Sequence, residues 1–445
     1  MPSSIPTAVS APGKVFLAGG YLVLDREYTA LVFGLSARIN IVAREIRTSP
    51  GIQLSEIVVD SPQFLEAQWR YGYHLAPDDG GFKLTQLQSG GRIDPNPFVE
   101  VTLSYALTYL ANRASRRASH AFKPAQFTIL ADNDYYSQPH SGTGTAANPT
   151  RFAKFQTTLR GANKTGLGSS AALVTALTAA LLSHYLPPAD FDIGSAEGKR
   201  TLHNLAQAAH CAAQGKVGSG FDVATAVYGS CRYRRFSPSV LKSIPEAGAP
   251  GFAPALTGLI DGGAWDTEVS KEGAKVPPGL ALRMCDVDCG SQTVGMVKQV
   301  LQWREADPAG AKTLWDELQA RNVALGRVLS EGRVDEIRSA TAGIRELIRS
   351  MGRQSGVPIE PEAQTELLDA LLGVEGVYNG VVPGAGGYDA VVLMMKDDEA
   401  TEGRVKEFLD AWSKLKGQRV RLLDVRGEMD GVRRESIEEY NGWIS

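Results

Sequence analysis

The feature that most constrains the fold of this chain is a glycine-rich run at residues 161–170 that passes directly into an apolar stretch at 171–186. Pro187 ends that stretch, so the pattern predicts a loop that opens a helix of about four turns. Gly166 and Gly168 let successive backbone N–H groups converge, and the positive end of the helix dipole lies behind them. The loop is therefore predicted to bind an anion such as phosphate.

The same run is also typical of a surface turn whose serine caps a helix. Lys164 beside the loop favours the anion site, and so do the small Ala171 and Ala172, which allow close approach of a ligand. The run is not a Walker A loop, because Leu167 stands where that motif needs lysine. The chain also lacks the Gly-x-Gly-x-x-Gly, His-Glu-x-x-His and Gly-x-Ser-x-Gly motifs. A Rossmann dinucleotide site, a metalloprotease and an α/β-hydrolase therefore have no support.

Composition excludes several classes of protein. A length of 445 residues predicts two to three domains, and 43% hydrophobic with 21% charged residues excludes disorder as the main state. Lysine and arginine number 46 against 49 for aspartate and glutamate, so a net charge of −3 offers no excess of cations to a nucleic acid. The cysteines form no Cys-x-x-Cys pair, so reduced thiols are expected at Cys211, Cys231, Cys285 and Cys289.

The chain shows no sequence signal for a membrane or for secretion. Its first residues lack the basic start and apolar run of a secretory signal. The most apolar stretch, 171–186, falls short of the roughly 20 apolar residues that a bilayer needs. We therefore expect a cytoplasmic protein without a membrane partner.

Periodicity predicts several other elements. Asn96 is a predicted N-cap with Pro97 at the first helical position, and the polar stretch 132–156 predicts a long loop or an insertion. Proline and glycine recur from 237 to 278, and a domain boundary is placed just before that stretch. The remaining predictions are helices at 197–214, 292–305, 309–330 and 333–352 and strands at 15–18, 38–45, 126–131, 280–288, 390–395 and 420–425.

Three further segments carry residues suited to phosphate chemistry. Residues 11–14, Ala-Pro-Gly-Lys, place a lysine after a Pro-Gly turn, although a surface turn is the usual explanation. Residues 218–222 end in Asp222 directly after a glycine-rich bend, and a helix-capping aspartate fits equally well. Residues 383–389 form another tight glycine loop, for which a plain turn is the simpler interpretation.

Taken in order, these segments resemble the three motifs of the kinase superfamily named for galactokinase, homoserine kinase, mevalonate kinase and phosphomevalonate kinase. The matches are residues 11–14, 166–172 and 383–387, and the resemblance extends from about residue 11 to residue 390. Three motifs in this order are far more specific than any one of them. Within the superfamily, four runs look like the fungal phosphomevalonate kinases: APGKVFLAGGYLVLD, KTGLGSSAALVTAL, GKVGSGFDVATAVYG and DVDCGSQTVGMVKQV.

The resemblance implies an α+β fold of two domains, 1–235 with the ATP-binding loop and 236–445, with the active site in the cleft between them. It implies an enzyme that uses ATP and Mg²⁺ to phosphorylate (R)-5-phosphomevalonate, a step of the mevalonate pathway to isoprenoids and sterols. The expected partner is this small molecule, and the protein is expected to act as a monomer. A mevalonate or other small-alcohol kinase and a non-catalytic nucleotide sensor remain alternatives. Lys14 together with Asp222 favours catalysis, since a sensor needs neither.

The resemblance also implies roles for individual residues of this sequence. Lys14 and Asp222 match the catalytic lysine and aspartate. The ATP phosphates would be bound by Lys164, Gly166, Leu167, Gly168, Ser169, Ser170 and Ala171, with Ser170 as the hydroxyl on Mg²⁺. The acceptor would be bound by Lys14, Tyr21, Ser219, Ser291, Gln292 and Gly386.

Two departures from the superfamily pattern bear on the site. Asn163 stands near a position where many members have proline, which affects only the residues that lead into the loop. Mevalonate kinases supply a Mg²⁺-binding glutamate where this chain has His210, Cys211 and Ala212, so substrate phosphates and water would complete the metal's ligands. His210 lies seven residues after His203 on one predicted helix, and packing is the expected role of both.

The chemistry depends on the acceptor. A phosphate monoester is largely dianionic at pH 7, because its second pKa is about 6, and it needs no base. Asp222 would then orient Lys14, while Lys14 and Lys164 hold two mutually repelling phosphates together. An alcohol acceptor would instead need Asp222 as a base.

Overall fold

The computed structural model describes residues 6–49, 55–87, 94–113, 122–136, 151–287 and 295–444. The predictions for Cys289, Ser291 and Gln292, and for residues 137–150 of the predicted insertion, lie outside these ranges. Within the described ranges, we find no helix with the length and apolar character needed to cross a membrane.

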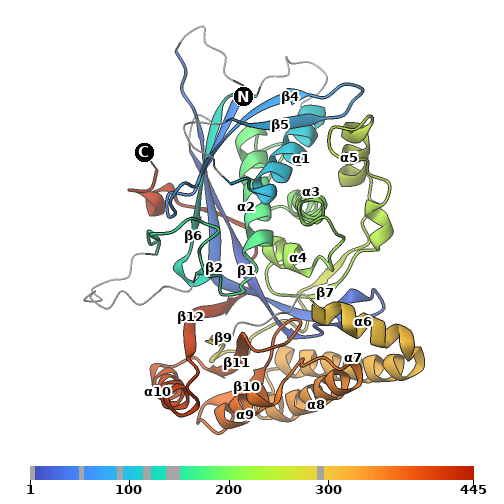
Figure 1. Cartoon of the computed structure of the whole chain (residues 1–445), viewed down its shortest axis with the longest axis vertical. Helices are drawn as coiled ribbons and strands as arrows, with labels where there is room; N and C mark the ends of the chain where they lie inside the picture. The colour runs from blue at the N-terminus through green and yellow to red at the C-terminus, as the bar shows by residue number, and fades with distance from the viewer. Residues whose placement is uncertain are drawn as a thin grey trace.

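One mixed β-sheet runs through both halves of the described chain (Figure 1). Its order is β10-β11-β9-β12-β2-β6-β3-β4-β5, with β1 and β7 pairing beside β2, β13 on β1, and β8 on β7. Of these pairs only β3 and β6 run parallel. The strands are β1 Thr7–Ala18, β2 Ala30–Glu45, β3 Glu56–Asp60, β4 Gln68–Leu75, β5 Phe82–Leu87, β6 Ala125–Ala131, β7 Cys231–Arg234, β8 Glu268–Ser270, β9 Leu280–Val287, β10 Val377–Val381, β11 Ala390–Lys396, β12 Val420–Glu428 and β13 Arg433–Glu435.

Helices cover the sheet at two places. In Figure 1, α1, α2 and α3 lie beside the blue-to-green upper part of the sheet, and α6 to α9 lie around its lower part. Helix α2 packs directly on β1 and β2, and α1 and α3 pack on α2. The helices are α1 Pro97–Arg113, α2 Ser169–Tyr185, α3 Ala196–Gln214, α4 Phe221–Tyr228, α5 Phe252–Asp261, α6 Met296–Ala306, α7 Pro308–Ser330, α8 Ile337–Ser355, α9 Glu362–Leu371 and α10 Glu399–Lys416.

The strongest local sequence signals predicted their elements correctly. Helix α1 begins at Pro97, and Asn96 Oδ1 accepts a hydrogen bond from the Val99 N–H at 3.4 Å. Val99, Leu103, Ala106, Leu107 and Leu110, which share one face of α1, are all buried. Helices α2, α3 and α6 to α8, and strands β6, β9, β11 and β12, also lie where periodicity predicted them, with small shifts at their ends.

The sequence did not predict several elements that begin at a glycine or in which apolar and polar residues alternate only weakly. The proline- and glycine-rich stretch 237–278 contains α5 and β8, and α5 starts after Gly251, which has a φ of +77°. Helix α4 starts in the same way, after Gly220 within the 218–222 bend, and the meander of β3, β4 and β5 gave no clear signal. Because one sheet runs through both halves, the domain division at 235/236 stays a prediction.

The three described cysteines are buried and free, as predicted. Burial raises the pKa of the Cys231 and Cys285 thiols to about 12, which keeps them protonated and unreactive at neutral pH.

Candidate active site

A β-bulge places Lys14. The pairing of β1 with β2 shifts register between Pro12 and Lys14, at a proline that has no N–H to give to the sheet. A Cβ at Gly13 would lie 2.9 Å from the Leu167 carbonyl oxygen, so only glycine lets β1 approach the loop this closely. The Lys14 N–H then donates to the same oxygen at 2.9 Å. The first and second motifs are therefore joined backbone to backbone.

The loop before α2 has the conformation of an anion-binding site. Gly166 and Gly168 have φ of +74° and +80°, values that side chains other than glycine rarely adopt. Gly168 is the N-cap of α2, and no side chain caps the helix, so the alternative of a capping serine is wrong. A Cβ at Gly166 would meet nothing within 4 Å. The helix therefore presents its N-terminus to open space at the loop.

Lys14 lies across this loop beside Asp222. A Cβ at Gly168 would come within 2.8 Å of Lys14 Cε, so the lysine stem uses the space that glycine leaves. The ammonium lies 5.5 Å from the centre of the Phe221 ring. Burial lowers the pKa of Lys14, and the charge of Asp222 partly offsets that effect.

The 218–222 bend is fixed through its backbone. Gly220, with φ of +80°, caps α4, and a Cβ there would lie 2.7 Å from Gln207 Oε1. The Tyr233 hydroxyl donates to the Ser219 carbonyl oxygen at 2.8 Å, and Arg235 donates to the Gly218 carbonyl oxygen at 2.9 Å. Asp222 follows in the first turn of α4, where its Oδ1 accepts the Val223 N–H at 3.0 Å.

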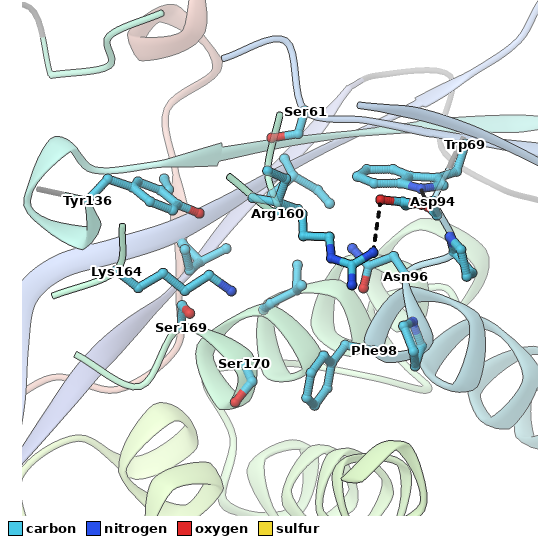
Figure 2. Close-up of a pocket in the computed structure, with 17 residues that line it drawn as sticks. Ser61, Trp69, Asp94, Asn96, Phe98, Tyr136, Arg160, Lys164, Ser169 and Ser170 are labelled. Atoms are coloured by element: carbon cyan, nitrogen blue, oxygen red, sulfur yellow. Dashed lines mark hydrogen bonds and ion pairs between the residues drawn. The ribbon is translucent and has the colours of Figure 1, made fainter. Parts of the chain in front are cut away.

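A first cavity, of about 320 Å³, ends at the loop before α2 (Figure 2). Its walls are mainly apolar and aromatic, with Trp69, Phe98, Tyr136 and Leu173 among them. In Figure 2 the Lys164 ammonium points into the cavity near Ser169, and Arg160 extends across it to Asp94, at 3.6 Å. Burial among these walls lowers the pKa of Lys164.

A second cavity, of about 300 Å³, is also lined by residues of the loop before α2. It is lined by β1, the loop, the end of β9 and the third glycine motif, with Lys14, Lys164, Gly166, Met284 and Gly386 among its residues. Lys164 lines both cavities. One ammonium group therefore stands where the two cavities meet.

The third glycine motif is held from two sides. The Tyr21 hydroxyl donates to the Ala385 carbonyl oxygen at 2.7 Å. Gly386, with φ of +86°, approaches the 357–361 segment so closely that a Cβ would lie 2.2 Å from the Ile359 carbonyl oxygen. The Gly387 N–H donates to that oxygen at 3.0 Å. Tyr21 therefore holds the backbone of a loop that, with Ala385 and Gly386, lines the second cavity.

Comparison with known proteins gives the family. The model of the GHMP kinases N terminal domain matches residues 146–230. The phosphomevalonate kinase of Gibberella zeae is 66% identical over 438 residues, covering 98% of both chains, and that of Aspergillus fumigatus is 45% identical over 485 residues, again with 98% of both chains. The chain belongs to the phosphomevalonate kinase family.

The fold agrees with this assignment. The structure of the Streptococcus pneumoniae phosphomevalonate kinase in complex with phosphomevalonate and AMPPNP aligns with a TM-score of 0.63 at 17% identity, covering 95% of this chain and 99% of that one. The predicted α+β fold of the GHMP kinases is confirmed.

In this member of the phosphomevalonate kinase family, Ser170 contacts a buried histidine. Ser170 Oγ lies 3.2 Å from Nε2 of His210, and His210 Nδ1 lies 3.9 Å from Asp222 Oδ2. The packing role predicted for the histidines fits His203, whose ring lies against Tyr228 and Trp265, but is incomplete for His210.

The structure brings most of the predicted site residues together. Lys14, Lys164 and Asp222 lie around the loop 166–171, and Gly386 lines the second cavity. Tyr21 contacts the Ala385 carbonyl oxygen, and the Ser219 carbonyl oxygen accepts from Tyr233. Ser291 and Gln292 lie outside the described residues.

The sequence reasoning missed the walls of the first cavity and the contact of His210. Trp69 comes from β4, Phe98 from α1 and Tyr136 from the segment after η2 (Asn133–Tyr135). No local motif joins these three residues, and His210 is separated from Asp222 by a helix end and a glycine bend. The sequence offered one signal for these cavity walls, which is that each aromatic residue lies in or next to a strand or near a helix N-terminus.

Proposed function

We propose that this chain transfers the γ-phosphoryl group of ATP to (R)-5-phosphomevalonate and releases 5-diphosphomevalonate and ADP. Full-length similarity to phosphomevalonate kinases supports the reaction. The structural observation that carries it is the meeting of two cavities at Lys164, one with apolar and aromatic walls and the other flanked by Lys14. A nucleotide base and a charged acceptor need these two different environments.

The first cavity suits the nucleoside of ATP. Its aromatic walls can stack on a base, and it leads to Ser169 and Ser170 at the N-terminus of α2. Phosphates placed there would be bound by backbone N–H groups and the helix dipole. We infer that Trp69, Phe98 and Tyr136 surround the base and ribose, and that the loop 166–171 holds the phosphates.

The second cavity suits an acceptor that is itself a phosphate. A dianionic acceptor and the γ-phosphate repel each other, and the cost of bringing them together is met by cations placed in advance. Lys14 and Lys164 line this cavity together with Asp286 and Asp389, and Asp222 favours the charged form of Lys14 against the effect of burial. In this mechanism Asp222 keeps Lys14 charged and oriented, and no side chain has to remove a proton from the acceptor.

The described residues fit Mg²⁺ only as a partner of the nucleotide. They contain no group of three His, Cys, Asp or Glu side chains that could hold a metal ion. Ser170 would supply an oxygen ligand at the helix N-terminus, and phosphate oxygens and water would complete the six that Mg²⁺ prefers. When bound, Mg²⁺ neutralises phosphate charge.

An ADP-release assay with phosphomevalonate, mevalonate and galactose in parallel tests the proposal. We expect turnover with phosphomevalonate alone. Turnover with mevalonate in its place would identify a small-alcohol kinase, and nucleotide binding without turnover of any of the three would identify a sensor. Mg·ATP should also stabilise the folded protein, by about 2.7 kcal/mol at a hundredfold excess over its Kd. No shift in Tm with Mg·ATP would contradict a kinase.

Three further properties rest on the sequence. We propose two domains divided at 235/236, a monomeric state and a cytoplasmic location. The free buried thiols support a reducing compartment. Light scattering after gel filtration and imaging of a tagged chain test the last two properties.

A further inference from the structure

His210 is buried between Phe98, which lines the first cavity, and Asp222. Its side chain is 2% exposed, and its ring stacks on Phe98 with 5.8 Å between ring centres. Phe98 lines the first cavity. The ring is therefore held in one orientation by packing, and its two nitrogens face polar groups of the site.

Each ring nitrogen has a defined neighbour. Nε2 lies 3.2 Å from Ser170 Oγ, which is hydrogen-bond distance, and Nδ1 lies 3.9 Å from Asp222 Oδ2. The side-chain amide nitrogen of Gln214 lies against the same ring, 2.9 Å from Nδ1 and 2.7 Å from Nε2. The imidazole thus connects the first turn of α2 with the first turn of α4.

We propose that His210 is a positioning residue, which accepts the hydroxyl proton of Ser170 at Nε2 and points its Nδ1–H toward Asp222. With that proton directed into the protein, the lone pairs of Ser170 Oγ face the loop and the phosphates. This tautomer fits the nearer Gln214 side chain when its amide oxygen, and not its nitrogen, faces Nδ1, and the more distant Asp222 carboxylate also attracts the Nδ1–H. The inference rests on the proposed function and names the residue that orients its metal-binding hydroxyl.

His203 provides a matched control on the same helix. It is also 2% exposed, and its Nδ1 lies 3.2 Å from Asn204 Oδ1. Burial lowers the pKa of His203 to about 4, so it packs as a neutral ring between Tyr228 and Trp265. Replacing either histidine by phenylalanine removes a buried imidazole from α3, but only one of the two rings touches Ser170.

A double-mutant cycle between Ser170 and His210 tests the proposal. His210→Phe should lower kcat by about 10- to 100-fold, the usual effect of losing the group that orients a metal ligand. Ser170→Ala/His210→Phe should then have the kcat of Ser170→Ala, because His210 acts through that hydroxyl. His210→Gln, whose amide reaches the position of Nε2, should recover most of the activity, and His203→Phe should leave kcat unchanged. Additive losses in the double variant would overturn the proposal.

Two measurements do not depend on turnover. Calorimetry should show that Mg²⁺ strengthens ATP binding less in His210→Phe than in the wild type or His203→Phe, and an equal strengthening contradicts the proposal. Long-range ¹H–¹⁵N spectra of the wild type should place the His210 proton on Nδ1 alone, and a proton on Nε2 contradicts it even when the variants do not fold. Failure of the wild type to phosphorylate phosphomevalonate would instead refute the proposed function. The calorimetry and the ¹H–¹⁵N spectra would then still test whether His210 orients Ser170.

Discussion

The loop at 165–170 and the loop at 383–387 are both rich in glycine and both border the second cavity, but their glycines serve different purposes. Gly166 has a φ of +74°, a value that favours glycine, and a Cβ there would meet nothing within 4 Å. The missing side chain therefore leaves room for a ligand. Gly386 has a φ of +86° and is also packed against the Ile359 carbonyl oxygen. The first loop leaves open space at Gly166, whereas the second is packed at Gly386 against its own protein.

The two loops also differ in the parts of the protein that they pack against. The first loop begins a buried helix and carries the Lys14 stem across Gly168. The second loop packs against Ile359. The next residue, Glu360, is a buried carboxylate that forms ion pairs with Arg345 at 2.6 Å and Arg349 at 2.9 Å. A ligand can therefore approach the first loop, while the position of the second is set by packing and ion pairs elsewhere in the C-terminal half.

The largest expected effect concerns the charge at the first loop. Lys14→Ala should lower kcat by about 10²–10³-fold, the usual cost of removing one preorganised group that stabilises transition-state charge. Asp222→Asn should cost less, because with a phosphate acceptor it only weakens the support of Lys14. Steady-state kinetics of both variants measure the order, and a greater loss in Asp222→Asn would show that the aspartate acts as a base.

The next effect separates the two loops by stability. Gly386→Ala should lower the free energy of unfolding by about 1–3 kcal/mol beyond the strain of its positive φ, because its Cβ would overlap the Ile359 carbonyl oxygen. Gly166→Ala should cost only the backbone strain, about 1–2 kcal/mol. Urea unfolding compares them. The order should reverse for the affinity of Mg·ATP, and equal effects of both variants on stability and affinity would contradict the distinction.

A smaller effect is expected at the contact that ties the second loop to the N-terminal half. Tyr21→Phe removes the hydrogen bond to the Ala385 carbonyl oxygen and should cost about 0.5–1.5 kcal/mol of stability. Because the loop borders the acceptor cavity, KM for phosphomevalonate should rise several-fold while KM for ATP stays unchanged. A change in KM for ATP alone would place Tyr21 in the nucleotide site.

The smallest effect is a gain in stability that accompanies loss of activity. Burial lowers the pKa of Lys14 below 10.5, so at neutral pH the folded protein bears the cost of a charge that the unfolded chain carries in water. Lys14→Met should therefore raise Tm slightly at pH 7. The gain should shrink as pH rises through the lowered pKa toward 10.5, because the folded wild type then loses this proton first. The exposed Lys414→Met is the control, and a gain that does not change with pH would exclude this cause.

Local sequence signals predicted α1 to α3, α6 to α8 and several strands, because each of these elements depends on nearby residues. Asn96 followed by Pro97 predicted the start of α1, and the apolar run after Ser170 predicted α2. Helices α4 and α5 were missed because both start at a glycine in the left-handed region, which looks like a turn in the sequence. The meander of β3 to β5 was missed because its stability comes from pairing with distant strands.

The sequence by itself determined which residues are candidates for the site, since a lysine after Pro-Gly, a glycine loop ending in two serines and an aspartate after a glycine bend are each recognisable within a few residues. Tertiary structure alone decided how these pieces meet. The contact of Lys14 with Leu167, the joining of two cavities at Lys164 and the link from Ser170 through His210 to Asp222 connect separate elements. The physical reason is that side-chain neighbours are set by the packing of α2 and α4 on the sheet and of α3 on these two helices, and no local pattern encodes that packing.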